Sequence, residues 1–175
     1  TPDQSSAASD VYKRQTQKFA REKTPTTHFR SIRDSENPDC FDREIWKQMA
    51  DQGLTGILIP EEFGGSNFGL SGIGIVLQEL GRTLTPSPLL ATAVIGASFL
   101  SKLGTEDQKK RYLPEIVKGN ITCCFAFEEG PRHNPIVSET NAEKKGNKFI
   151  INGKKTFVID GGFADLVIIA AKTKN

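Results

Sequence analysis

The sequence has little of what metal sites and disulfide frameworks need. It contains two histidines, His28 and His133, and three cysteines, Cys40, Cys123 and Cys124. Two of the cysteines are adjacent, and the three match neither a disulfide framework nor the ligand spacing of a zinc site. We therefore expect no metal site, and we interpret the cysteine usage as typical of a reducing, cytoplasmic compartment.

No sign of charge predominates, and no long apolar run is present. The chain has 23 Lys and Arg residues against 21 Asp and Glu residues, a formal net charge of +2. Nucleic acids and anionic membranes usually bind basic patches, so this balance argues against both as main partners. The longest apolar stretch, residues 89–100, is interrupted by polar residues and is too short to span a bilayer. Residues 1–15 lack the apolar core of a secretory signal.

What the chain contains is typical of a soluble globular protein, with 37% hydrophobic and 25% charged residues. Its 175 residues are enough for one medium domain or two small ones. Residues 1–18 are polar with little periodicity, so we expect them to be disordered or only partly helical, or extraneous to the natural protein. Residues 24–39 are polar and contain Pro25 and Pro38, which predicts a connector.

Hydrophobic periodicity predicts four helices between residues 42 and 119. Asp42 can cap the first, and Ser71 begins the second. The third spans residues 89–103 and is apolar on most sides, which predicts a buried helix. Thr105 and Gln108 form a capping-box pattern at the start of the fourth. The apolar stripes of the first two helices are formed by Ile45, Trp46, Met49, Ala50, Ile73, Val76, Leu77, Leu80 and Leu84.

The periodicity changes after Gly119. Residues 121–127 and 166–171 are β-prone runs, and residues 149–159 form two further runs around Asn152-Gly153. That dipeptide is a strong hairpin signal, because both central residues of a type I′ turn need positive φ.

The order of these elements predicts an α+β fold. We expect an α-helical domain over residues 19–119, followed by the first part of an antiparallel β domain over residues 120–175.

Four short segments follow one another with a recognisable spacing. They are Gly53-Leu-Thr-Gly-Ile-Leu-Ile-Pro-Glu-Glu-Phe-Gly-Gly65, Leu77-Gln-Glu-Leu-Gly81, Leu103-Gly-Thr-Glu-Asp-Gln-Lys-Lys-Arg-Tyr-Leu-Pro114, and Ile151-Asn-Gly-Lys-Lys155 with Gly161-Gly-Phe-Ala-Asp165. Each alone is a weak signal. Together, in register, they resemble the acyl-CoA dehydrogenase family.

The resemblance implies a three-part protein: a helical N-terminal domain, a barrel-like β domain and a C-terminal helical bundle. This chain would hold the first part and about half of the second, and the bundle is absent from it. FAD would lie between the β domain and the bundle, with the acyl-CoA thioester against the flavin. The implied reaction removes an α-proton, taken by a carboxylate base, and a β-hydride, taken by flavin N5. The base belongs to the bundle, so no catalytic residue is assigned and the chain alone is expected to be inactive.

The resemblance also assigns cofactor contacts. Glu128 stands where the family has a flavin-contacting Thr, and Asn134 where it has a Ser near the pyrophosphate. Phe157 replaces a Trp and Ile159 a hydroxyl residue. The backbone N–H of Ile159 remains able to donate. The candidate cofactor-binding residues are Phe125, Phe127, Glu128, Glu129, Asn134, Phe157, Val158 and Ile159, and the candidate substrate-binding residues are Arg132, His133 and Asn134.

The pattern Glu128-Glu129 followed by Arg132, the segment Phe41-Asp42-Arg43 with Trp46, and Asp160-Gly161 together resemble a bacterial branch that includes dehydrogenases for pimeloyl-CoA and steroid side chains, often built as paired subunits. Implied partners are acyl-CoA, related subunits in a homo- or hetero-oligomer, and an electron-transfer flavoprotein or similar acceptor. Glu128 would oppose the negative charge of reduced flavin, and Arg132 would offset it if the loop folds back. Two other functions stay open: a non-catalytic partner subunit, and a flavin oxidase or monooxygenase on the same fold.

Structural roles compete with several of these assignments. Trp46 and Met49 are expected in the helix core, and Cys123-Cys124 as buried filler of a strand. Glu61 and Glu62 are not assigned as the catalytic base. They follow a proline in a glycine-rich loop, where carboxylates usually satisfy backbone donors. Core packing competes with flavin contact for both Phe125 and Phe127, a solvated loop competes with phosphate contact for His133, and ordinary helix packing competes with an acyl-chain wall for residues 89–99.

Overall fold

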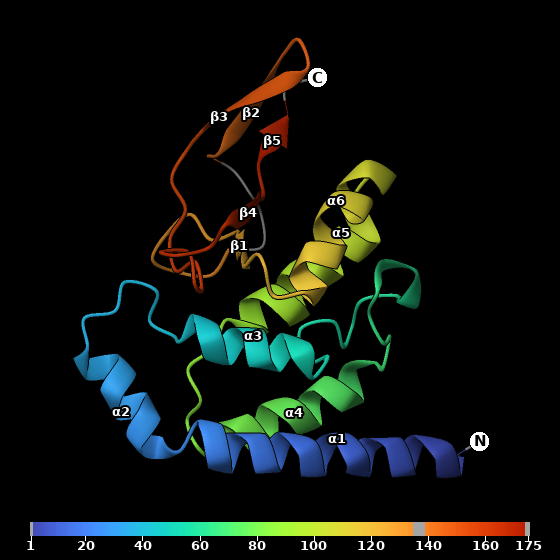
Figure 1. Ribbon diagram of the computed structural model, residues 1–175. Helices are drawn as coiled ribbons and strands as arrows, with labels where there is room; N and C mark the ends of the chain where they lie inside the picture. Colours follow the sequence, from blue (N-terminus) through green and yellow to red (C-terminus); the bar gives the residue numbers. More distant parts are fainter. Residues whose placement is uncertain (1, 135–138, 174–175) are drawn as a thin grey trace.

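A computed structural model describes residues 2–134 and 139–173 (Figure 1). Helices form one end of the molecule and short strands the other. The helical elements are α1 (Pro2–Lys23), α2 (Thr26–Asp34), α3 (Arg43–Asp51), the 3₁₀ turn η1 (Glu61–Phe63), α4 (Leu70–Gly81), the π-helix η2 (Leu90–Gly96), α5 (Ala97–Leu103) and α6 (Glu106–Val117). The strands are β1 (Cys123–Ala126), β2 (Asn141–Lys145), β3 (Lys148–Asn152), β4 (Leu166–Ile169) and β5 (Lys172–Thr173).

The expectation of disorder for residues 1–18 is wrong, because α1 is one continuous helix. Tyr12, Thr16, Phe19 and Ala20 fall at helical spacing and form its inner stripe. Phe19 and Ala20 are buried in the core, and Tyr12 packs against its edge. Thr16 is a polar residue in the middle of this stripe, which hides the periodicity in the sequence.

The connector predicted over residues 24–39 is also wrong, since its middle folds as α2. Pro25 precedes the first helical residue, a position where its fixed φ and missing N–H do no harm. No residue of α2 is buried, and its apolar side chains, Phe29 and Ile32, are only partly covered.

The core of the helical end is formed by α1, α3 and α4, of which the periodicity predicts α3 and α4. The Asp42 carboxylate accepts the backbone N–H of Glu44 (2.8 Å) and Ile45 (3.2 Å), which confirms the predicted cap of α3. Trp46 and Met49 are fully buried, as expected. Leu84 is the exception in the predicted stripes: it lies beyond the end of α4 with a φ of 55° and faces solvent.

The predicted third helix is two elements, η2 and α5. It begins and ends close to the predicted positions, with Gly104 as its C-cap, but its first part winds as a π-helix. Residues 91–100 are all buried or partly buried, as predicted, whereas Leu90 and Leu103 at the two ends face solvent. The capping box of Thr105 and Gln108 at α6 is confirmed in both directions.

The strands pair differently from the antiparallel arrangement expected within the α+β class, which itself is confirmed. β1 pairs with β4 in parallel, and β2 pairs with β5 in parallel. The β2–β3 pair is antiparallel. Its two-residue turn is Gly146-Asn147, with a φ of 61° at Gly146.

The hairpin predicted at Asn152-Gly153 is therefore wrong. A Cβ atom on Gly153 would lie 2.5 Å from Thr140 Oγ1, so this glycine permits a close backbone approach instead of a turn. Beyond it, residues 153–157 run without strand pairing.

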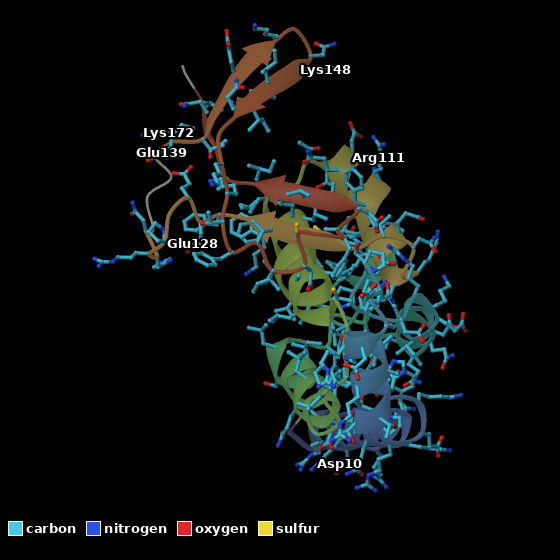
Figure 2. All side chains as sticks on the ribbon, turned by 90° about the vertical axis from the view of Figure 1, so that its left-hand side faces the viewer. Asp10, Arg111, Glu128, Glu139, Lys148 and Lys172 are labelled. Carbon is cyan, nitrogen blue, oxygen red and sulfur yellow. The ribbon has the colours of Figure 1, made fainter. Side chains whose placement is uncertain are left out.

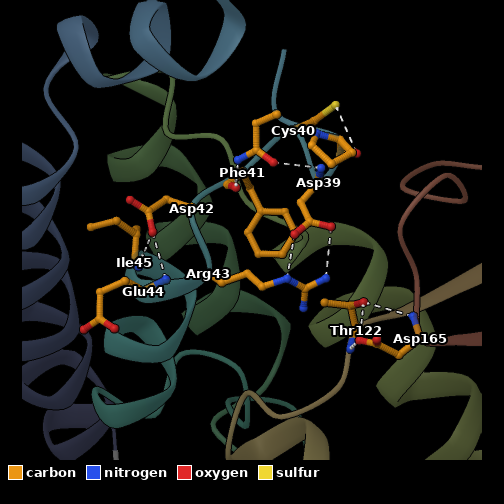
Figure 3. A network of polar contacts seen from close by, with 11 residues as sticks. Asp39, Cys40, Phe41, Asp42, Arg43, Glu44, Ile45, Thr122 and Asp165 are labelled. Atoms are coloured by element: carbon orange, nitrogen blue, oxygen red, sulfur yellow. Dashed lines mark hydrogen bonds and ion pairs between the residues drawn. The ribbon is translucent and has the colours of Figure 1, made fainter. Parts of the chain in front are cut away.

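A polar network joins the helical end to the strands (Figure 3). Asp165, just before β4, accepts the backbone N–H (2.8 Å) and the hydroxyl (2.9 Å) of Thr122, just before β1. Arg43 forms an ion pair with Asp39 (2.6 Å), and its pKa is raised by that contact and by the charge of Asp165. Close by, the Phe163 ring packs on Phe41 with 5.0 Å between centroids. These contacts fix the start of β1 and β4 against α3.

Within the described part of the chain, no helix is both long and apolar enough to cross a membrane.

Candidate functional site

A row of aromatic rings runs from α5 along β1. Phe125 and Phe127 alternate with buried Ala126, so both rings lie on one face of the strand. Phe125 stacks on Phe99 of α5 with 4.2 Å between centroids and on Phe127 with 5.7 Å. His133 continues the row at 6.3 Å from Phe127. All three phenylalanines are half-buried, so the row packs against α5 and still offers apolar surface.

The loop after β1 folds back on itself through Glu128. Its carboxylate contacts His133 Nδ1 at 2.5 Å and receives the backbone N–H of Asn134 at 3.4 Å. The hydrogen bond from His133 holds the pKa of the Glu128 carboxyl below its ordinary value. The loop thus folds back, and the side chain beside Glu128 is His133, not Arg132.

Glu129 forms a second, better shielded pair with Lys155. The two side chains are 11% and 9% exposed, and Lys155 Nζ lies 3.0 Å from Glu129 Oε1. The same carboxylate accepts the backbone N–H groups of Glu139 (3.0 Å) and Thr140 (2.8 Å). Lys155 also donates to the carbonyl oxygen of Phe127 (2.9 Å). Three stretches of chain therefore meet at this pair.

The three candidate substrate-binding residues line one hollow. A cavity of about 390 Å³ is bounded by the loop after β1 and by Glu139, which lies on the same flank of the molecule as Glu128 (Figure 2). Arg132, His133 and Asn134 are exposed on its wall, and Glu129 contributes to it. The structure thus brings these residues together at a surface open to solvent.

The second candidate segment, Phe157 to Ile159, forms an exposed turn. Phe157 has a φ of 51° and is 76% exposed, and Ile159 also faces solvent. Within the described residues, the backbone N–H groups of these three residues have no hydrogen-bond acceptor. Apolar side chains next to free N–H donors fit a planar heteroaromatic group with acceptors along its edge, such as a flavin.

The two candidate segments are directly connected. The backbone N–H of Thr156 donates to the carbonyl oxygen of Glu128 (2.8 Å), and the Thr156 hydroxyl donates to that of Gly130 (3.0 Å). The residues that make this connection, Lys155 and Thr156, were not among the predicted site residues. Lys155 is part of the Ile151–Lys155 motif, but nothing in the motif shows which of its two lysines is buried.

The cysteines of β1 are confirmed as buried filler. Both are fully buried and free, and Cys123 lies against η2. Burial raises the pKa of the Cys123 thiol to about 12, which keeps it protonated and unreactive. Burial likewise raises the pKa of the Asp160 carboxyl, which lies close enough to Cys124 to raise the pKa of that thiol further. Among the described residues, no three His, Cys, Asp or Glu side chains form a cluster able to hold a metal ion.

Comparison with known proteins decides the family. The family model for the acyl-CoA dehydrogenase N-terminal domain matches residues 7–120. The chain belongs to the acyl-CoA dehydrogenase family. Members of this family are FAD-dependent oxidoreductases.

Similar proteins agree with this assignment. Mitochondrial isovaleryl-CoA dehydrogenase of Pongo abelii is 34% identical over 142 residues, which cover 75% of this chain and 32% of that protein. Acryloyl-CoA reductase (NADH) of Anaerotignum propionicum is 35% identical over 138 residues, 77% of this chain and 35% of that protein. The chain spans about a third of the length of these two curated relatives.

Solved structures show the same architecture. An acyl-CoA dehydrogenase from Geobacillus kaustophilus superposes with a TM-score of 0.81 at 26% identity, over 94% of this chain and 43% of its own. A variant of the steroid ACAD Tcur3481–Tcur3483 superposes with a TM-score of 0.86 at 25% identity, over 97% of this chain and 46% of its own. These superpositions cover both the helices and the strands, so they confirm the predicted α+β class.

Proposed function

We propose that this chain forms the helical domain and the first strands of the β domain of an FAD-dependent acyl-CoA dehydrogenase, which desaturates an acyl-CoA between its α and β carbons. The observation that carries the proposal is the direct contact between the loop after β1 and the stretch before Phe157, the two segments that the family resemblance assigns to the cofactor. The helical domain would comprise residues 2–119, with α1 included, and the β domain would begin at residue 120.

The residues of this chain would bind and orient, and none of them would be the base. Phe127 and Phe157 would supply apolar surface to the ring system, and the N–H groups of Val158 and Ile159, which have no acceptor among the described residues, would donate to its polar edge. Arg132 and His133 would face phosphate groups of cofactor or substrate from the cavity beside Glu139. When bound, the flavin supplies a hydride acceptor.

The remaining partners follow from the same proposal. Acyl-CoA would be the substrate, and an electron-transfer flavoprotein or similar acceptor would reoxidise the flavin. Related subunits would form a homo- or hetero-oligomer. The protein would be cytoplasmic, a proposal supported by three free cysteines.

A spectrum of the purified full-length protein tests the cofactor. We expect a flavin absorption band, bleached when an acyl-CoA substrate is added without oxygen. A colourless protein that takes up no added FAD would sink the proposal. Residues 1–175 alone should be inactive and should bind FAD more weakly than the full-length protein. Tight binding by this chain alone would contradict that part.

One observation favours a second function, a non-catalytic partner subunit. Glu128 adds a carboxylate where the family resemblance places a neutral flavin contact, and its pKa is held low, so it stays charged at neutral pH. Turnover of acyl-CoA by the isolated full-length protein would exclude this alternative, whereas turnover only after mixing with a related subunit would support it. Oxygen consumption without an electron acceptor would indicate an oxidase instead.

A further inference from the structure

The Glu129–Lys155 pair lies where three otherwise separate stretches of chain meet. Glu129 belongs to the loop after β1, Glu139 and Thr140 precede β2, and Lys155 follows β3. Residues 153–157 have no strand partner in the described structure, so a few single contacts hold them in place: the Thr156 backbone bond to Glu128 and the side-chain contacts of Thr156 and Lys155. Lys155 supplies two of these contacts, to Glu129 and to the carbonyl oxygen of Phe127.

We propose that Glu129 and Lys155 are positioning residues that set the distance between the two halves of the cofactor site, namely the loop over residues 128–134 and the turn over residues 157–159. This inference rests on the proposed function. In this role the pair acts through the backbone on both sides of the site, by way of the contacts with Phe127, Glu139 and Thr140. Glu128 follows Phe127, whose carbonyl oxygen Lys155 binds. Phe157 follows Thr156, whose backbone N–H donates to Glu128.

The burial of the pair explains why it would govern position. Both side chains are nearly enclosed, so the charges attract each other more strongly than an exposed pair would. Removal of one partner would leave the other without its buried counter-charge, and the chain would move to let water reach it. Because Lys155 lies two residues before Phe157, such a movement would displace the exposed turn and its free N–H donors.

The neighbouring lysine gives a matched control. Lys154 is exposed and adjacent to Lys155, so Lys154→Met changes the net charge and the composition equally without breaking the buried pair. Glu129→Gln removes the opposite charge, while its carbonyl oxygen still accepts a backbone N–H. The double variant Glu129→Gln/Lys155→Met leaves no unpaired charge.

The experiment uses the full-length protein and measures FAD affinity and the shape of the flavin absorption band at a temperature where far-UV circular dichroism shows every variant folded. For Lys155→Met we expect about tenfold weaker FAD binding or more, with an altered band. Glu129→Gln should act in the same direction. The double variant should lose less than the two single losses combined, because the residues act as a unit. Lys154→Met should behave as the parent.

The outcomes separate the two proposals. A parent protein that binds no FAD overturns the proposed function and this inference with it. A parent that binds FAD, together with a folded Lys155→Met variant of unchanged affinity and band shape, overturns the inference alone. So do equal losses in Lys154→Met and Lys155→Met. If Lys155→Met does not fold, Glu129→Gln decides: parental affinity and band shape in that variant contradict the positioning role.

Discussion

At the scale of single residues, the Thr92 side chain forms the hydrogen bonds to the free edge of β1 that a neighbouring strand would otherwise form. Its hydroxyl accepts the backbone N–H of Cys123 (2.9 Å) and donates to the carbonyl oxygen of the same residue (3.1 Å), on the edge of β1 away from β4. Thr92→Val keeps the shape but leaves both buried backbone groups unpaired. We expect a loss of about 1–3 kcal/mol in the free energy of unfolding, measured by urea denaturation.

Thr16 provides the control for this prediction. It is equally buried, but its hydroxyl has no hydrogen-bond partner within the described residues. Thr16→Val should therefore be neutral or slightly stabilising, since it removes a buried polar group that gains nothing from its surroundings. Equal losses in the two variants would show that the replacement of a buried hydroxyl by a methyl group, and not the loss of the hydrogen bonds to Cys123, determines the effect at Thr92.

At the scale of elements, η2 approaches β1 so closely that its last residue must be glycine. A Cβ atom on Gly96 would lie 2.6 Å from Cys123 Sγ, whereas one on Gly74 in α4 would meet nothing within 4 Å. We expect Gly96→Ala to lower the free energy of unfolding by about 1–3 kcal/mol through overpacking. Gly74→Ala should raise it by about 0.5–1 kcal/mol, because alanine favours a helix. Thermal denaturation of the two variants should therefore shift in opposite directions.

Features that depend on neighbouring residues could be predicted from the sequence, and those that depend on distant segments could not. The caps at Asp42 and Thr105 act within one turn, so short sequence patterns predict them. The π-winding of η2 occurs where this helix contacts β1, a distant segment of the chain, and no local pattern in the sequence predicts it. The hairpin predicted at Asn152-Gly153 is wrong for a related reason. The dipeptide is typical of a turn, but Gly153 instead allows Thr140, a residue distant in sequence, to pack closely against the backbone. Gly146-Asn147 made the turn with a weaker signal.

At the scale of the whole molecule, the family resemblance proposes two cofactor segments but does not predict the contacts that hold them together. Glu128, Arg132, His133 and Asn134 were predicted from one contiguous stretch, and they share one loop. Lys155 was missed because its role depends on a contact with Glu129 across the sheet. Pairings between distant segments depend on loop closure and on parallel strands, neither of which has a local signature.

The junction between helices and strands allows a test of how far the chain folds as one unit. Asp165 anchors Thr122 at the start of β1, and Asp165→Ala removes both of its side-chain acceptor bonds. Trp46, the only tryptophan in this chain, reports the helical core by fluorescence. With the exposed Cys40 replaced by serine in all proteins, labelling of the buried Cys123 and Cys124 reports the opening of β1. In the parent chain we expect one urea midpoint for both probes.

In Asp165→Ala we expect thiol labelling at lower urea than the fluorescence change, because the strands lose about 1–3 kcal/mol while the helical core keeps its contacts. Asp165→Asn retains one acceptor and should fall between the two. Midpoints that shift together in all three proteins would mean that the strands have no stability separate from the helices.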